Sequence, residues 1–302
     1  MIAQRDNTVG FIGLGMMGLP MATNILKKRH PLVVYDRVRE RTALLAAEGA
    51  TAGASAKDVS ERAKIVVLMV DTTSQVHEVL FEKDGLIHGA RVGDKVICMS
   101  TIDPESTKKF AATLATKGIA LLDAPVAGMV KGAREGTLRA FVGGDSADVE
   151  LCRPALDAMA STVAHMGPVG QGMVMKLINN MLCQLGWVII SEALVLGTKA
   201  GLDPKLMVQM IEGATGDSMA FKYMAPKWLA RDFDGIRLDI TYKDVQNQID
   251  LGRSLGVPMF MASLGHQIYQ MARTAGHGNE DGIAIVKIYE QLTGVKLSGV
   301  TK

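Results

Sequence analysis

The chain has 302 residues, of which 48% are apolar and 21% charged, and its formal net charge at pH 7 is +2. This length is sufficient for two domains, and the composition is that of a globular protein. The nearly balanced charge gives no reason to expect nucleic acid or an anionic membrane as a partner. Because no apolar run reaches about 18 residues and the N-terminus lacks an apolar signal-peptide core, we expect neither a membrane-spanning helix nor a signal peptide.

The cysteine and histidine content predicts neither disulfides nor a metal centre. Three cysteines, Cys98, Cys152 and Cys183, are widely spaced and odd in number, which is typical of buried thiols in a reducing cytoplasm. The six histidines are scattered and make no metal-binding spacing. We therefore predict a cytoplasmic protein with no metal site.

A glycine-rich turn follows the first apolar run, Val9–Ile12. Gly13, Gly15 and Gly18 match the pattern G-x-G-x-x-G, and a helical pattern runs from Gly18 to about Lys28. In such a unit the first glycine permits a sharp turn, the second lets a pyrophosphate approach the backbone, and the third lets the helix pack close to the strand. The helix N-terminus offers N–H groups to the phosphates. We predict a dinucleotide-binding loop made of Gly13, Gly15, Met16, Met17 and Gly18.

The second apolar run, Leu32–Tyr35, ends at Asp36. An acidic residue about 20 positions beyond the motif is where the ribose of a dinucleotide is bound. A carboxylate there accepts hydrogen bonds from both ribose hydroxyls and repels a 2′-phosphate, so NAD is favoured. Arg37 follows directly and could turn towards a 2′-phosphate, which leaves NADP open. For Arg39 and Arg41 we prefer the interpretation of a solvated helix face.

Strands and helices alternate through the first half of the chain. The apolar runs predict strands over residues 9–12, 32–35, 65–70, 95–99, 119–122 and 139–144. Helices are predicted between them, at 18–28, 37–47, 55–62, 74–81 and 103–117. Continuous apolar runs such as 65–70 are typical of strands buried on both faces. The alternation predicts an α/β fold with an open, mostly parallel, doubly wound sheet of the Rossmann type.

Ligands of such sheets bind beyond the carboxyl ends of the strands. This rule places several segments on one shared rim, in addition to the glycine loop and Asp36. They are Val70-Asp71, Ser100-Thr101 and the stretch from Asp123 to Gly128. We expect Val70, Asp71 and Thr101 to contact the cofactor.

A long helical stretch begins at Gly170-Gln171-Gly172 and reaches about Ala200, with apolar residues almost all round. A helix of this kind is buried, often between domains or subunits. Lys176 and Asn180 are four residues apart and hence on one face. The structural alternative is a lysine that reaches water and a satisfied core amide. However, burial and the positive end of the helix dipole both lower the pKa of such a lysine, towards values useful for proton transfer.

The remainder of the chain shows only helical patterns, over residues 204–213, 223–230, 242–255, 258–275 and 281–292. We therefore predict a dinucleotide-binding domain over residues 1–168 and an all-α C-terminal domain over residues 169–302, beginning with the long interdomain helix. Taken alone, Lys243-Asp244 is interpreted as an ordinary solvent-facing pair. The closing residues Ser298–Lys302 are expected to be loose.

Four blocks in this order resemble the β-hydroxyacid dehydrogenases, the family of 3-hydroxyisobutyrate dehydrogenase and tartronate semialdehyde reductase. The resemblance covers nearly the whole chain. The blocks are Gly10–Asn24, the Asp-Ala-Pro-Val-Ala-Gly run of Asp123–Gly128, Gly170–Asn180 with its Lys-Leu-Ile-Asn-Asn, and Phe233–Asp244. The resemblance implies a Rossmann domain, a C-terminal domain similar to that of 6-phosphogluconate dehydrogenase, and oxidation of a hydroxy acid with NAD or NADP.

The resemblance also implies roles for individual residues. Lys176 corresponds to the catalytic lysine, which takes the hydroxyl proton during oxidation, and Asn180 to the residue that holds the substrate and orients that lysine. Thr101 is at a nicotinamide-contacting position, and Lys243 at a position that closes over the cofactor. Ala127 and Gly128 lie in the loop that receives the substrate carboxylate through its backbone N–H groups.

The chain departs from the family pattern at three positions. Ala127 replaces a serine and Met129 a second glycine, so the loop loses a hydroxyl donor and gains a bulky apolar side chain. Since a hydrogen bond to a charged group contributes about 1.5–3 kcal/mol, compensation is expected, and Lys131 and Arg134 are candidates, unless they are surface charges. Asp71 stands where the family usually has proline, for which the sequence offers no explanation.

We therefore expect an NAD(P)-dependent oxidoreductase that reversibly oxidises the hydroxyl of a small 3-hydroxy acid. The alternatives are an imine or semialdehyde reductase of the same superfamily, or a dinucleotide-binding protein without turnover. Imine reductases usually lack the lysine found at Lys176, which argues against that reading. The mostly apolar helix after Gly172 further predicts a homodimer or homotetramer.

Overall fold

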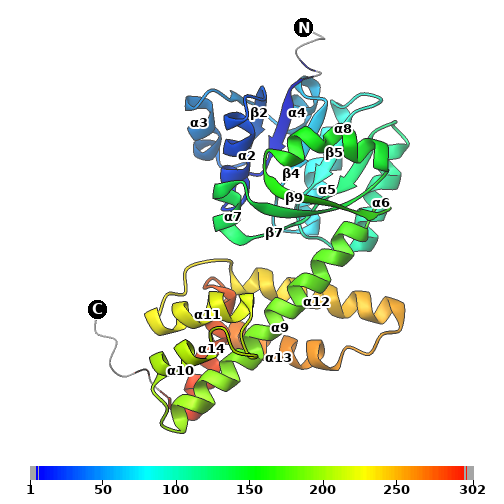
Figure 1. The fold of residues 1–302 in the computed structure, drawn as a ribbon. Helices are drawn as coiled ribbons and strands as arrows, with labels where there is room; N and C mark the ends of the chain where they lie inside the picture. The colour runs from blue at the N-terminus through cyan, green and yellow to red at the C-terminus, as the bar shows by residue number, and fades with distance from the viewer. Residues whose placement is uncertain (1–4, 6, 296, 298–302) are drawn as a thin grey trace. The chain divides into compact units, whose positions relative to one another are not determined.

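The computed structural model describes residue 5, residues 7–295 and residue 297 (Figure 1). The predicted loose tail, Ser298–Lys302, lies outside the described residues. The chain divides into two compact units, Met1–Lys176 and Leu177–Lys302. The division lies inside one continuous helix, Gln171–Lys199.

Nine strands of the described residues form one sheet in the first unit, in the order β3-β2-β1-β4-β5-β6-β8-β7, with β9 beside β8. The strands β1 to β6 run parallel, whereas β8 is antiparallel to both β6 and β7. Their bounds are β1 Val9–Ile12, β2 Leu32–Tyr35, β3 Thr51–Ala52, β4 Ile65–Leu68, β5 Lys95–Cys98, β6 Ala120–Asp123, β7 Val126–Ala127, β8 Leu138–Gly143 and β9 Ala160–Gly167.

Helices connect these strands and lie against the sheet (Figure 1). They are α2 Gly18–Lys27, α3 Arg39–Ala47, α4 Ala56–Arg62, α5 Thr73–Phe81, the short η1 Leu86–His88, α6 Pro104–Ala115, α7 Met129–Glu135 and α8 Ser146–Asp157. Several begin where the sequence places a cap. Asp103 accepts the N–H of Ser106 at the start of α6, and Thr72 forms a capping box with Gln75 at the start of α5.

Two separate cores show that the sheet is covered on both faces. Because successive strand residues point to opposite faces, Phe11 packs in one core with α2 and α8, and its neighbour Ile12 packs in the other with α4 and α5. The same alternation separates Ile97 from Cys98. The predicted doubly wound, mostly parallel α/β sheet is therefore confirmed.

Six elements of the first unit were not predicted from the sequence: β3, η1, β7, α7, α8 and β9. Two of them, β3 and β7, have two residues each and carry no usable periodicity. The edge strand β9 is largely exposed or half-buried, so it lacks the continuous apolar run of a central strand. Strand β3 extends the sheet beyond β2, and β7 and β9 extend it on either side of β8, without changing its class.

The second unit contains only helices among its described residues. The long helix α9, Gln171–Lys199, begins in the first unit and continues into it, and the others are α10 Pro204–Ile211, α11 Met219–Ala230, α12 Leu238–Leu255, α13 Phe260–Thr274, η2 Gly282–Ile285 and α14 Val286–Thr293. Buried side chains of α12, α13, η2 and α14, with Tyr269 and Leu238 at 0% exposure, form its core. The predicted all-α C-terminal part is confirmed.

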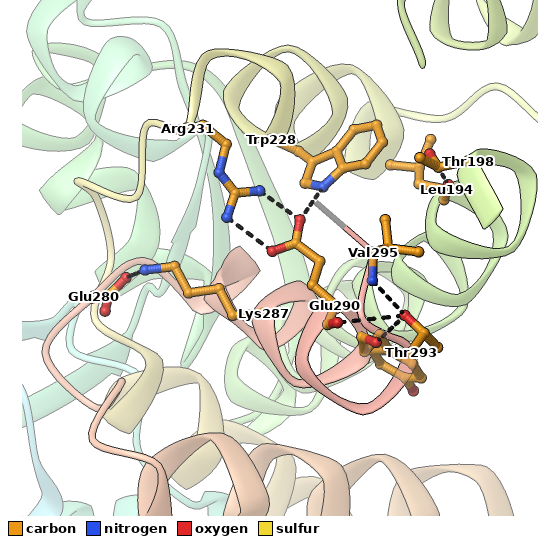
Figure 2. A network of polar contacts seen from close by, with 10 residues as sticks. Leu194, Thr198, Trp228, Arg231, Glu280, Lys287, Glu290, Thr293 and Val295 are labelled. Atoms are coloured by element: carbon orange, nitrogen blue, oxygen red, sulfur yellow. Dashed lines mark hydrogen bonds and ion pairs between the residues drawn. The ribbon is translucent and has the colours of Figure 1, made fainter. Parts of the chain in front are cut away.

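A polar network fixes the last helix to this core (Figure 2). The Glu290 carboxylate accepts hydrogen bonds from both terminal guanidinium nitrogens of Arg231, at 2.5 and 2.8 Å, and from the Trp228 indole N–H, at 2.8 Å. Trp228 is fully buried. Because a fork-shaped ion pair restricts geometry as well as supplying attraction, this network sets how α14 lies on α11.

Among the described residues, one helix, α9, is long enough and apolar enough to cross a membrane, judged by length and composition alone. The interior helix of a soluble protein has the same character. On its own, α9 therefore does not indicate a membrane protein.

The stability of the second unit is expected to fall in mildly acidic solution because of His266. This ring is 7% exposed, stacks on Tyr242 with 4.1 Å between ring centroids, and has its pKa lowered by burial and by Arg273. The unfolded chain therefore binds a proton at a higher pH than the folded one, so stability is lost as pH falls below about 6.5.

Urea unfolding at pH 7.5 and 5.5 measures this effect, since both tryptophans, Trp187 and Trp228, lie in the second unit and report its unfolding. His266→Gln should reduce the loss between the two pH values. An equal loss in the variant and the wild type would contradict the assignment to His266.

Candidate active site and cofactor cleft

The glycine loop between β1 and α2 has the geometry of a phosphate-approach turn. Gly13 has φ +95°, and a Cβ there would collide with the backbone of Met69. A Cβ on Gly18 would collide with the carbonyl oxygen of Gly13, so the start of α2 packs closely on the turn. By contrast, a Cβ on Gly15 would have no atom within 4 Å. The backbone at Gly15 is thus open to an approaching ligand.

Asp36, directly after β2, ties this loop to the next strand. Its side chain is 9% exposed, and it accepts the N–H of Leu14 at 2.6 Å through Oδ2 and the N–H of Val38 at 2.7 Å through Oδ1. Each carboxylate oxygen has two acceptor positions. Both oxygens therefore keep capacity for a further donor such as a ribose hydroxyl.

A cleft of about 740 Å³ lies in the first unit beside these two features. It is lined at one side by the glycine loop and the end of β2, and at the other by the start of α4 and one face of α5. Six of the residues predicted to contact a cofactor line this cleft: Gly13, Gly15, Asp36, Arg37, Val70 and Asp71. The cleft and the open backbone at Gly15 fit the adenosine and pyrophosphate portion of a dinucleotide.

Other residues of the predicted rim are placed differently. The lining of this cleft does not include Met16, Met17, Gly18 or Thr101; Met16 is exposed, and Met17 packs partly on the core. Arg41 is exposed on α3, as expected for a solvated helix face, and it also lines the cleft, with Nη1 3.8 Å from Asp36 Oδ1. Asp71 also lines the cleft, and its N–H donates to Gln75 Oε1 at 2.8 Å.

Asp123, the last residue of β6, holds the first turn of α9. Its carboxylate is fully buried and accepts the N–H of Gly170 at 2.7 Å and that of Met173 at 2.8 Å. Burial raises the pKa of Asp123, and the backbone N–H donors oppose that rise. A carboxylate at a helix N-terminus is also favoured by the helix dipole. The Asp123 carboxylate is therefore used to anchor the first turn of α9 and does not face the rim. This anchor fixes the position of Lys176, which lies about one turn after Met173.

Asn180 lies one turn beyond Lys176 on α9. Its Nδ2 donates to Asp244 Oδ2 at 2.9 Å, and Gln184 Nε2 donates to the same oxygen at 3.2 Å. Asp244 is 3% exposed, and Lys243 Nζ lies 3.2 Å from its Oδ1. The interpretation of Lys243-Asp244 as a solvent-facing pair is therefore wrong for Asp244. This buried carboxylate orients Asn180 through the amide nitrogen, a role that the sequence analysis did not assign.

The loop after β6 ends in an unusual backbone. Gly128 has φ +129°, and Met129, which begins α7, has φ +55°. A side chain in this left-handed region is disfavoured by roughly 1–2 kcal/mol. Ala127 is half-buried, whereas the candidate cations Lys131 and Arg134 are exposed on α7. Their exposure favours the interpretation of surface charges.

Two of the three thiols are buried and unreactive. Burial raises the pKa of Cys98 and of Cys152 to about 12, which keeps both protonated and unreactive. Cys183 is half-buried on α9. Among the described residues, no cluster of three or more histidine, cysteine or acidic side chains is positioned to hold a metal ion.

The fold and the cleft are those of a dinucleotide-binding protein with a helical second unit, and two family models agree. Residues 8–167 match the NAD binding domain of 6-phosphogluconate dehydrogenase, and residues 170–289 match the NAD-binding domain of NADP-dependent 3-hydroxyisobutyrate dehydrogenase.

Similar proteins of known name cover almost the entire chain. A 2-(hydroxymethyl)glutarate dehydrogenase of Eubacterium barkeri is 36% identical over 98% of this chain and 99% of its own. A 3-sulfolactaldehyde reductase of Escherichia coli is 34% identical over 92% and 94%. The crystal structure of a 3-hydroxyisobutyrate dehydrogenase from Salmonella typhimurium is 31% identical, covers 94% of this chain and 100% of its own, and has a TM-score of 0.87.

The chain belongs to the β-hydroxyacid dehydrogenase family. The predicted enzyme class, an NAD(P)-dependent oxidoreductase acting on a CH–OH group, is thereby confirmed. An imine reductase of Bacillus cereus is only 18% identical with a TM-score of 0.62, and it shares the fold alone.

The different surroundings of the loop glycines lead to a prediction. Gly15→Ala should change the free energy of unfolding by less than about 1 kcal/mol, because its methyl group meets no atom. It should nevertheless weaken NAD binding at least about tenfold, because it blocks the pyrophosphate approach. Gly18→Ala should instead destabilise the first unit by about 1–3 kcal/mol through overpacking.

Urea unfolding and calorimetric titration with NAD distinguish these effects. Wild-type NAD affinity in the Gly15→Ala variant would show that the open backbone is not the phosphate position.

Proposed function

We propose that this enzyme reversibly oxidises the hydroxyl of a small 3-hydroxy acid, with Lys176 as the acceptor of the hydroxyl proton. One observation carries this assignment: Asp123 holds the first turn of α9 at the carboxyl end of β6, which brings Lys176 within one turn of the sheet edge where ligands of parallel sheets bind. A lysine on an anchored helix keeps its position during the reaction, as proton transfer requires.

The bound nicotinamide cofactor would accept the hydride, and the chain supplies the positions and the proton acceptor. Lys176 takes the hydroxyl proton during oxidation and returns it during reduction. Asn180, oriented by Asp244, holds the substrate and positions the Lys176 amine. Gly13, Gly15 and Gly18 with the neighbouring Met16 and Met17 cradle the pyrophosphate, and Thr101 and Lys243 are assigned to the cofactor's remaining portion.

NAD is proposed as the preferred form of the cofactor. Asp36 places a buried carboxylate where the adenosine ribose would bind, and this carboxylate accepts hydroxyl donors but repels a 2′-phosphate. Arg37 and Arg41, the two arginines of the cleft, both lie within 4 Å of a carboxylate oxygen. Neither guanidinium is therefore as available to a 2′-phosphate as the sequence alone suggests.

The substrate is proposed to carry an acidic group. The names of the two relatives specify a glutarate and a sulfolactaldehyde, which bear a carboxylate or a sulfonate. In this chain the backbone N–H groups of Ala127 and Gly128 are assigned to that group. Met129 adds a side chain beside them, which favours a substrate with an apolar or extended remainder over the smallest hydroxy acids.

The competing readings are an imine or semialdehyde reductase and a binding protein without turnover. Lys176, which imine reductases usually lack, favours a hydroxyl substrate over an imine. The same lysine together with the Asn180–Asp244 pair favours turnover over simple binding. Semialdehyde reduction is the reverse of the proposed oxidation and uses the same groups.

We propose a homo-oligomeric, cytoplasmic enzyme. Leu182, Ile189 and Leu196 are seven residues apart on α9 and hence form one stripe, and they are 71%, 60% and 71% exposed. Phe260, Leu264 and Met271 give α13 a second exposed apolar face. Contiguous apolar faces of this kind are typical of subunit interfaces. The free cysteines, of which Cys98 and Cys152 are buried, suit the cytoplasm.

Substrate oxidation followed by the absorbance of the reduced cofactor tests the proposal. The panel contains 3-hydroxyisobutyrate, glycerate, both serine enantiomers, 4-hydroxybutyrate and 2-(hydroxymethyl)glutarate, with matched alcohols that lack the acid. We expect turnover of at least one hydroxy acid with NAD. Turnover limited to non-acid alcohols would remove the assigned acid anchor.

The variant Lys176→Ala should retain NAD binding and lose about 10²–10⁴-fold in kcat, because the proton acceptor is removed while the cleft is unchanged. Lys109→Ala, at an exposed lysine on α6, is the matched control and should keep full activity. A Lys176→Ala variant with wild-type kcat would refute the role of this lysine.

The α9 stripe predicts a change of subunit count on substitution. Ile189→Glu places a charge in the centre of the stripe, so the particle should dissociate towards the mass of one chain, as measured by light scattering after size exclusion. Ala112→Glu adds the same charge to an exposed position on α6 and should leave the mass unchanged. A wild-type protein that is already monomeric at working concentration would contradict the proposed oligomer.

A further inference from the structure

We propose that Glu78 is a specificity residue that selects against NADP by occupying Arg37. The two side chains come from separate elements, the turn after β2 and the helix α5, and both line the cofactor cleft. Arg37 Nη1 lies 3.5 Å from Glu78 Oε2. The inference extends the proposed preference for NAD and names the group that enforces it.

A 2′-phosphate differs from a ribose hydroxyl by a charge of about −1.5 to −2 near neutral pH. Proteins bind such a group best with an arginine fork, which presents two parallel N–H donors. Arg37 directly follows the ribose-binding Asp36 and is therefore the natural candidate. The Glu78 carboxylate attracts the same guanidinium and competes with any incoming phosphate.

Arg41 does not replace Arg37 in this role. Its Nη1 lies 3.8 Å from Asp36 Oδ1, so this guanidinium is also directed at a carboxylate. The formal charges lining the cleft are predominantly negative. The acidic residues are Asp36, Asp71, Glu78, Glu82 and Asp84, against the cations Arg37, Arg41 and Lys83. A second carboxylate opposite Asp36 therefore repels a 2′-phosphate at the same time as it binds Arg37.

The exposure of the pair makes this role separable from folding. The Arg37 and Glu78 side chains are 64% and 50% exposed, and exposed ion pairs contribute little to stability. Replacing Glu78 with the isosteric glutamine should therefore leave the fold intact. The consequence should appear in ligand selection, where the released guanidinium meets a doubly charged group.

The test is calorimetric titration of the purified full chain with NAD and NADP in low-salt buffer, without substrate. In Glu78→Gln the ratio of the NADP Kd to the NAD Kd should fall roughly five- to tenfold, since one repulsive charge is removed and one charge-assisted contact is gained. Glu82→Gln removes an equal charge four residues further along the chain, at the residue that follows the end of α5, where Glu82 Oε1 lies 3.8 Å from His77 Nδ1. This control should change the ratio less than about twofold.

A double variant separates the pair from the general field of the cleft. Adding Arg37→Gln to Glu78→Gln should restore the wild-type ratio to within about twofold, because the phosphate-binding group is then absent. Equal shifts in Glu78→Gln and Glu82→Gln, or an unchanged ratio in Glu78→Gln, would overturn the inference. A wild type that prefers NADP would refute the proposed NAD preference, whereas the shift caused by Glu78→Gln would still report on Glu78.

Discussion

The interaction on which the active site depends is the buried contact between Asp123 and the first turn of α9. A carboxylate removed from water is destabilised unless it is paired or hydrogen-bonded, and Asp123 meets this requirement with the N–H groups of Gly170 and Met173. Gly172 and Gly143 lack the Cβ atoms that would occupy the same space. The start of the helix that carries Lys176 is therefore held tightly against the end of β6. As a result, the position of the lysine on α9 is determined by the sheet.

Asp36 shows the same arrangement at a different strand end. It follows β2, is nearly buried, and accepts main-chain N–H groups from the glycine loop and from the start of the next turn. A single carboxylate thus sets the loop conformation and, on the proposed function, also supplies the oxygens that bind the ribose. These two functions cannot be separated by substitution at Asp36 itself, because its removal also releases the glycine loop. Cofactor selection is more open to change at Glu78, which contributes charge without holding the backbone.

The sequence predicted those features whose signal lies within a few consecutive residues. Apolar strand runs and Gly13-x-Gly15-x-x-Gly18 fixed the parallel sheet and its ligand edge, because each signal lies within a few consecutive residues. Asp244 and Glu78 were not found in this way. Their importance comes from partners 64 and 41 positions away, Asn180 and Arg37, and no local pattern distinguishes such carboxylates from solvated ones. Asp123 was placed on the rim for the same reason, since its helix partner is 47 positions distant.

The loop from Ala127 to Met129 carries the remaining question of substrate. Glycine adopts the φ of +55° found at Met129 without penalty, whereas methionine is disfavoured there by roughly 1–2 kcal/mol. A side chain in a strained conformation persists only when its surroundings compensate for it. The flexible thioether of methionine suits irregular apolar gaps. With Ala127 offering no hydroxyl, backbone N–H groups are left to recognise the acid, and Met129 is the side chain of this loop that can recognise the rest. On the proposed function, the loop backbone therefore recognises the acid, and Met129 is the side chain that would contact the rest of the substrate.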